Sequence, residues 1–149
     1  MEKTYKLLVV LQNPWAKEGF EKWNPGVWKR KFKTSYTGKR LFGEIIPPGK
    51  FKIYFTNANP TIGKTSSSNL PPIISHLRKR IDAVCPDLIL ACGKNAYEAL
   101  VLIGGGIITM PIKHPAHRLF SKKEMAEIRA TLQRFEIHDG VEYFIDDLI

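Results

Sequence analysis

The 149-residue sequence has little cysteine, no long hydrophobic run and comparatively few acidic residues. Its two cysteines, Cys85 and Cys92, are too few for a disulfide framework or for a metal or cluster site held by four cysteines. The apolar run Leu7–Leu11 is too short for a secretion signal or a membrane span, so we expect no membrane association. We expect one domain over residues 1–149, in a reduced, intracellular protein of the cytoplasm, nucleoid or nucleus.

The shortage of acidic residues leaves the chain strongly basic. Lysine and arginine number 23 against 14 aspartate and glutamate, which gives a formal net charge of +9. Residues 29–52 hold eight of these cations and a single acid, and residues 113–123 hold four. Four aromatic side chains lie among the cations between residues 23 and 36. This combination suits a nucleic-acid backbone with rings available for stacking, and a basic surface without such a partner is the alternative.

Apolar patterning predicts an α/β fold. Four nearly continuous apolar runs predict buried parallel strands at Lys6–Leu11, Phe51–Thr56, Asp87–Cys92 and Ile107–Met110. Helical spacing predicts helices at 74–84 and 95–103, and a last helix that begins at a capping box of Ser121 and Glu124. We expect a three-layer α/β/α sandwich around a central parallel sheet of about four strands. Residues 19–49 show no clear period and are expected to form an irregular insert, and Tyr143–Ile149 is expected to add an edge strand.

Polar side chains follow the predicted strands at their carboxyl ends, where ligands bind in such sheets. They are Gln12 and Asn13, Asn57 and Asn59, and His114 and His117. An amide presents a donor and an acceptor side by side, which suits the edge of a planar heterocycle. A neutral histidine can donate a hydrogen bond to an oxygen that gains negative charge. The sequence therefore predicts a nucleobase pocket.

Four segments in order resemble the uracil-DNA glycosylase superfamily over most of the chain. They are Gln12-Asn13-Pro14-Trp15, the strand that ends at Asn57, residues 86–96, and the His-Pro segment 110–118. The resemblance implies a monofunctional DNA glycosylase that acts on single- or double-stranded DNA as a monomer. Such an enzyme flips uracil, or a related damaged or modified pyrimidine, out of the DNA and hydrolyses its N-glycosidic bond.

The resemblance also implies a role for each motif residue. Asn13 would order the attacking water, and His114 would stabilise negative charge on the departing base. Gln12 and Asn57 would hold the base, and Trp15 would lie beside its C5 position. DNA would be contacted by Lys94, Asn95, Lys113, Ala116, His117 and Arg118, with residues 116–119 as a wedge in the duplex. We expect no metal and no cofactor, because the cluster-holding branches of the family need four cysteines.

Two departures from the family pattern bear on activity. Leu11 stands where the first motif usually opens with glycine, and Asn13 is an amide, which does not take up a proton near neutral pH. Asn13 could therefore only position water, which predicts slower chemistry than a carboxylate would give. The main alternative is a catalytically weak or inactive relative that binds nucleic acid.

A second alternative is a nucleotide-binding protein. Residues 58–65 end in Gly-Lys-Thr after a strand and resemble a phosphate-binding P-loop, although Ala58 replaces its first glycine. Such a loop needs a helix that opens at the Lys-Thr pair, and the serine- and proline-rich residues 66–72 cannot begin one. His114 and His117 could form half of a metal site, but no carboxylate or cysteine stands near them in the sequence.

Overall fold

The computed structural model describes residues 4–12, 25–59 and 71–137. One parallel sheet crosses the molecule with the strand order β2-β1-β3-β4. Its strands are β1 (Tyr5–Leu11), β2 (Phe51–Asn57), β3 (Leu88–Cys92) and β4 (Ile108–Ile112). Three of the predictions lie outside the described residues: the roles of Asn13 and Trp15, the Gly-Lys-Thr loop, and the edge strand at 143–149.

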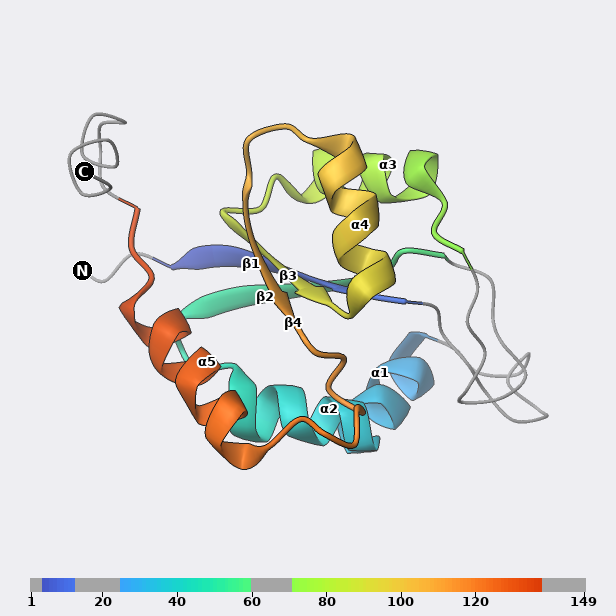
Figure 1. The fold of residues 1–149 in the computed structure, drawn as a ribbon. Helices are drawn as coiled ribbons and strands as arrows, with labels where there is room; N and C mark the ends of the chain where they lie inside the picture. The colour runs from blue at the N-terminus through green and yellow to red at the C-terminus, as the bar shows by residue number, and fades with distance from the viewer. Residues whose placement is uncertain (1–3, 13–24, 60–70, 138–149) are drawn as a thin grey trace.

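Helices cover both faces of the sheet (Figure 1). One face is covered by α3 (Ile74–Val84) and α4 (Lys94–Ile103). The other is covered by α1 (Pro25–Thr34), α2 (Tyr36–Arg40), the π-helical turn η2 (Leu41–Ile45) and α5 (Lys122–Arg134). No helix in the described part of the chain is long and apolar enough to cross a bilayer.

The central strand β1 holds the two layers together. Its Leu7 and Val9 pack on the side of α5 and η2, whereas Leu8 and Val10 pack against α3 and α4, and all four are fully buried. Side chains alternate between the faces of a strand, so a continuous apolar run fills both cores at once. The predicted three-layer sandwich with a four-stranded parallel sheet is confirmed.

The expectation of an irregular insert is wrong for residues 25–45, which are helical. Ser35 interrupts the helical period because its hydroxyl caps α2, accepting the Gly38 N–H at 3.1 Å. Gly38 is needed there, since a Cβ atom would stand 1.9 Å from the carbonyl oxygen of Phe32. Leu41 and Ile45, one turn apart, then reach the same core as β1 and anchor the segment to the sheet.

Two local predictions have different outcomes. The capping box is confirmed: the Ser121 hydroxyl accepts the Glu124 N–H at 3.1 Å, and the Ser121 N–H donates to the Glu124 carboxylate at 3.2 Å. Strand β4 runs two residues further than predicted, through Pro111 to Ile112. Proline is tolerated because β4 is the edge strand of the sheet formed by the described residues, where one row of its backbone groups faces no other described strand.

Candidate active site

The carboxyl ends of the four strands bring the predicted residues to one edge of the sheet. Asn57 ends β2, Gln12 follows β1, Gly93 follows β3 and His114 lies just beyond β4. The strand order therefore places Asn57 and His114 at the two ends of the row. Three strand spacings of about 4.8 Å separate them by about 14 Å. The ends of β1 and β3, with Gln12 and Gly93, lie between them.

Backbone hydrogen bonds fix the ends of β1 and β2 to each other. The Ala58 N–H donates to the Leu11 carbonyl at 2.7 Å, and the Asn59 N–H donates to the Gln12 carbonyl at 2.9 Å. The Asn59 side chain is buried and donates to the Pro71 carbonyl at 2.7 Å. Asn59 therefore ties the start of the next segment to this edge, which leaves Asn57 as the amide at the strand end.

His114 opens a tight loop after β4. The His117 N–H donates to the His114 carbonyl at 2.8 Å, and the Ala116 N–H donates to Nδ1 of the His114 ring at 3.1 Å. Because Nδ1 accepts a hydrogen bond, the neutral ring carries its proton on Nε2. Burial lowers the pKa of His114, and the charge of nearby His117 lowers it further. At neutral pH the imidazole is therefore uncharged and can donate one hydrogen bond from Nε2.

A cleft of about 740 Å³ lies beside this loop, within the size range of small-molecule sites. Six of the predicted residues line it, namely Gln12, Lys94, Asn95, Lys113, His114 and His117. Asn57 lies outside this lining, beyond β1, and Ala116 and Arg118 are exposed on the loop. Tyr97, Phe120 and Glu124 also line the cleft, although no motif in the sequence marks them as site residues.

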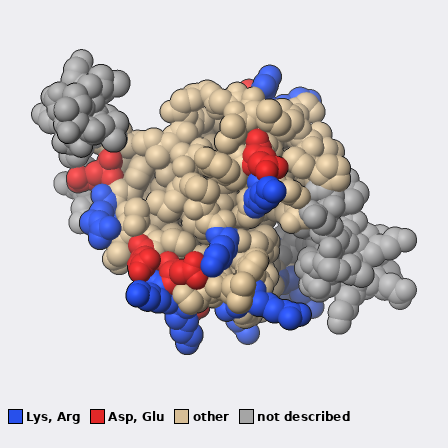
Figure 2. All heavy atoms as spheres, viewed as in Figure 1, with Lys and Arg blue, Asp and Glu red and all other residues tan. Residues whose placement is uncertain are grey.

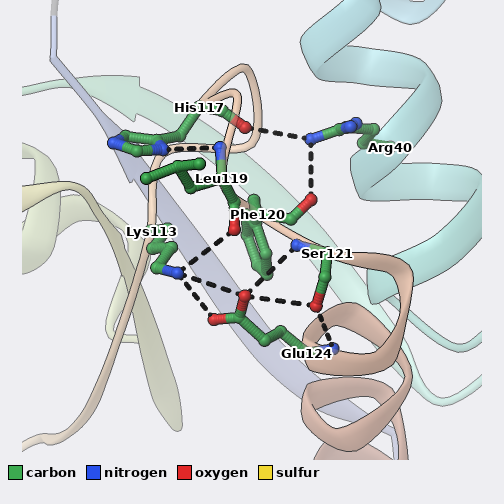
Figure 3. Close-up of polar contacts among 7 residues, drawn as sticks. All are labelled: Arg40, Lys113, His117, Leu119, Phe120, Ser121 and Glu124. Carbon is green, nitrogen blue, oxygen red and sulfur yellow. Dashed lines mark hydrogen bonds and ion pairs between the residues drawn. The ribbon is translucent and has the colours of Figure 1, made fainter.

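Glu124 places a carboxylate in a cleft where few acids were expected. Its Oε2 lies 2.9 Å from Lys113 Nζ, and its Oε1 accepts the Ser121 N–H (Figure 3). The hydrogen bond from Lys113, followed by that from Ser121, lowers the pKa of Glu124. Lys113 also donates to the Leu119 carbonyl at 3.3 Å, so its ammonium group links Glu124 to the end of the His114 loop. The capping box locates Glu124 in the sequence, but no sequence pattern pairs it with Lys113.

The opposite wall of the cleft includes the start of α4. Gly93 adopts φ +96° there, a conformation that side chains disfavour, and its N–H donates to the Ile112 carbonyl at 2.9 Å. The N-terminus of a helix attracts anions, and Lys94 adds a positive charge beside it. Lys94 lies 3.8 Å from Glu98, but both side chains are exposed and such a pair is weak.

The residue that replaces the family glycine does not obstruct this edge. The Leu11 side chain is 9% exposed and packs into the core beneath α5 and η2, together with Cys92 and Ile112. Burial raises the pKa of the Cys92 thiol, which therefore packs as an apolar group.

The three-layer sandwich defines an α/β protein, and its cleft lies at the carboxyl ends of the strands, the edge of the sheet where ligands usually bind in this class. The family model of the uracil DNA glycosylase superfamily matches residues 5–136, and the chain therefore belongs to this superfamily, as the sequence motifs predicted. Members of the superfamily are DNA glycosylases, and the family acts on DNA. No curated protein and no solved structure gives a significant match.

Proposed function

We propose that the protein is an intracellular, monomeric and monofunctional DNA glycosylase. It hydrolyses the N-glycosidic bond of uracil, or of a related damaged or modified pyrimidine, in DNA. The observation that carries this proposal is His114, a neutral imidazole beside the cleft whose Nδ1 accepts a backbone N–H and whose proton is therefore on Nε2. Family membership supplies the reaction class.

The proposed reaction begins with a base flipped out of the DNA. Asn57 and Gln12 hold the base, and the bond between C1′ and the base nitrogen breaks with its electron pair on the base. His114 donates from Nε2 to the base oxygen that gains negative charge, which lowers the barrier by about 3 kcal/mol, the scale of one oxyanion donor. A water placed by Asn13 adds its oxygen to C1′, and its surplus proton passes to solvent or to the released base.

Basic side chains support DNA as the partner. Figure 2, drawn in the same view as Figure 1, shows lysine and arginine side chains along the lower rim of the molecule, where α5, α2 and α1 lie. Leu119 is 73% exposed at the end of the His114 loop, which suits a side chain that fills the gap left by a flipped base. We expect binding to weaken steeply with salt, because phosphate contacts release counterions.

An excision assay on uracil-containing single- and double-stranded oligonucleotides tests the proposal. Abasic sites that form with the wild type, and form far more slowly with Asn13→Ala and His114→Ala, support it. Salt-sensitive DNA binding without product in any base context would instead identify an inactive relative. ATP turnover that depends on Lys64 would point to a nucleotide-binding protein.

We also propose that Trp15 disfavours thymine by filling the space beside C5 of the base. Trp15→Ala and Trp15→Gly should then gain activity on 5-substituted pyrimidines. The idea fails if both variants keep their fold and their activity on uracil but excise no 5-substituted base.

A further inference from the structure

One guanidinium that is distant in the sequence reaches the His114 loop from the neighbouring helix α2. Arg40, at the end of α2, donates from Nη1 to the carbonyls of Pro115, His117 and Phe120 at 2.9, 3.3 and 3.4 Å. Figure 3 shows two of these contacts, to His117 and Phe120, with the Arg40 side chain directed at the turn. Seventy-five or more residues separate Arg40 from each partner along the chain.

The shortest of these contacts bears directly on His114. The Pro115 carbonyl and the Ala116 N–H belong to the same peptide group, in which they point in opposite directions because the bond is trans. Arg40 holds the oxygen of this peptide at 2.9 Å, and His114 Nδ1 accepts its N–H at 3.1 Å. The guanidinium therefore fixes the plane of the peptide whose N–H selects the tautomer of His114. A charged donor on the oxygen also polarises the N–H and strengthens its hydrogen bond.

The position of the guanidinium is itself fixed. Its Cζ lies 4.4 Å from the centre of the Tyr36 ring, one turn earlier on α2. The Ser35 cap and the tight contact at Gly38 hold α2 in place. An arginine is always charged and has only donors, and the two N–H groups of Nη1 are shared among the three carbonyls, with the shortest contact to Pro115.

We propose that Arg40 is a positioning residue for the glycosylase reaction, which keeps His114 in the tautomer with its proton on Nε2. The proposal rests on the proposed function, since it assigns Arg40 to the same site. In this proposal the helical segment 25–45 contributes to the reaction through the contact of Arg40 with the His114 loop, and it does not touch the base.

The test compares Arg40→Ala and Arg40→Lys with Lys39→Ala. Lys39 is an exposed neighbour on the same helix, so its replacement removes the same charge without touching the loop. The first readout is the ¹⁵N spectrum of the His114 ring in the free protein. The wild type and Lys39→Ala should show an unprotonated Nδ1 and a protonated Nε2, whereas Arg40→Ala should show a mixture of tautomers. Arg40→Lys should lie between them.

The second readout is excision under saturating DNA. The kcat of Arg40→Ala should fall about 10- to 100-fold, the scale of a misplaced catalytic group, while its KM changes no more than in Lys39→Ala. Added methylguanidinium should restore part of the kcat. A wild-type His114 spectrum in both Arg40 variants, or a kcat of Arg40→Ala equal to that of Lys39→Ala, would overturn the proposal. If the wild type excises no base, the proposed function fails, and the spectra still decide the role of Arg40.

Discussion

Replacing His114 should separate binding of the base from stabilisation of its charge. The ring offers one hydrogen bond from Nε2, because Nδ1 already accepts the Ala116 N–H at 3.1 Å. Loss of one preorganised donor to a developing oxyanion costs about 3 kcal/mol, which corresponds to about 150-fold in kcat. His114→Ala should therefore lower kcat by about two orders of magnitude. Its KM should change little, since the hydrogen bond strengthens only as charge develops.

His114→Gln makes this prediction more specific. A glutamine amide can place a donor near the position of Nε2 but offers no ring nitrogen to the Ala116 N–H. We expect its kcat to lie between those of the wild type and His114→Ala. Single-turnover excision of uracil from a short oligonucleotide measures both variants, with circular dichroism as the control for folding. A loss of less than about threefold in His114→Ala, or a rise in KM alone, would refute the donor role.

Three further predictions follow from the described residues. The lowered pKa of His114 means that the unfolded chain binds more protons than the folded one below pH 6.5. The free energy of unfolding, measured by urea titration, should therefore rise with pH between the pKa of His114 in the folded protein and 6.5. His117→Ala should raise the pKa of His114 in the folded protein and so shorten the pH range over which stability rises. Glu124→Gln removes an exposed ion pair, so the free energy of unfolding should change little, whereas DNA affinity and its salt dependence should rise because Lys113 is released. Leu90→Ala, at a fully buried position of β3, should lower the free energy of unfolding by about 3 kcal/mol in urea denaturation.

The fold was predictable because its sheet depends on local patterns. Buried strands on a parallel sheet are apolar on both faces, and the run Leu7–Leu11 carries this pattern without interruption. The Ser121 and Glu124 pair marks a helix start within four residues, so it too is visible in sequence. The helices at 25–45 were missed because the cap at Ser35 divides their period and most of their residues are polar or exposed.

The site was predictable only in part. Its motifs are short stretches of sequence, whereas the contacts that hold these motifs in place join residues far apart in the chain. The residues at strand ends follow from the rule for parallel sheets, which placed Gln12 and His114 at the same edge. The contacts of Arg40 with the loop, and of Lys113 with Glu124, join residues that no periodicity or spacing relates. The roles of Asn13 and Trp15 remain predictions from the family motif.

The rate of uracil excision by the wild type, Asn13→Asp and Asn13→Ala tests the central claim most directly. A single-turnover assay on a single-stranded uracil oligonucleotide would measure all three proteins under the same conditions. We expect the wild type to form abasic sites, Asn13→Asp to form them faster because a carboxylate can accept a proton from water, and Asn13→Ala to lose most activity. Absence of product from both the wild type and Asn13→Asp, with DNA still bound, would contradict the account.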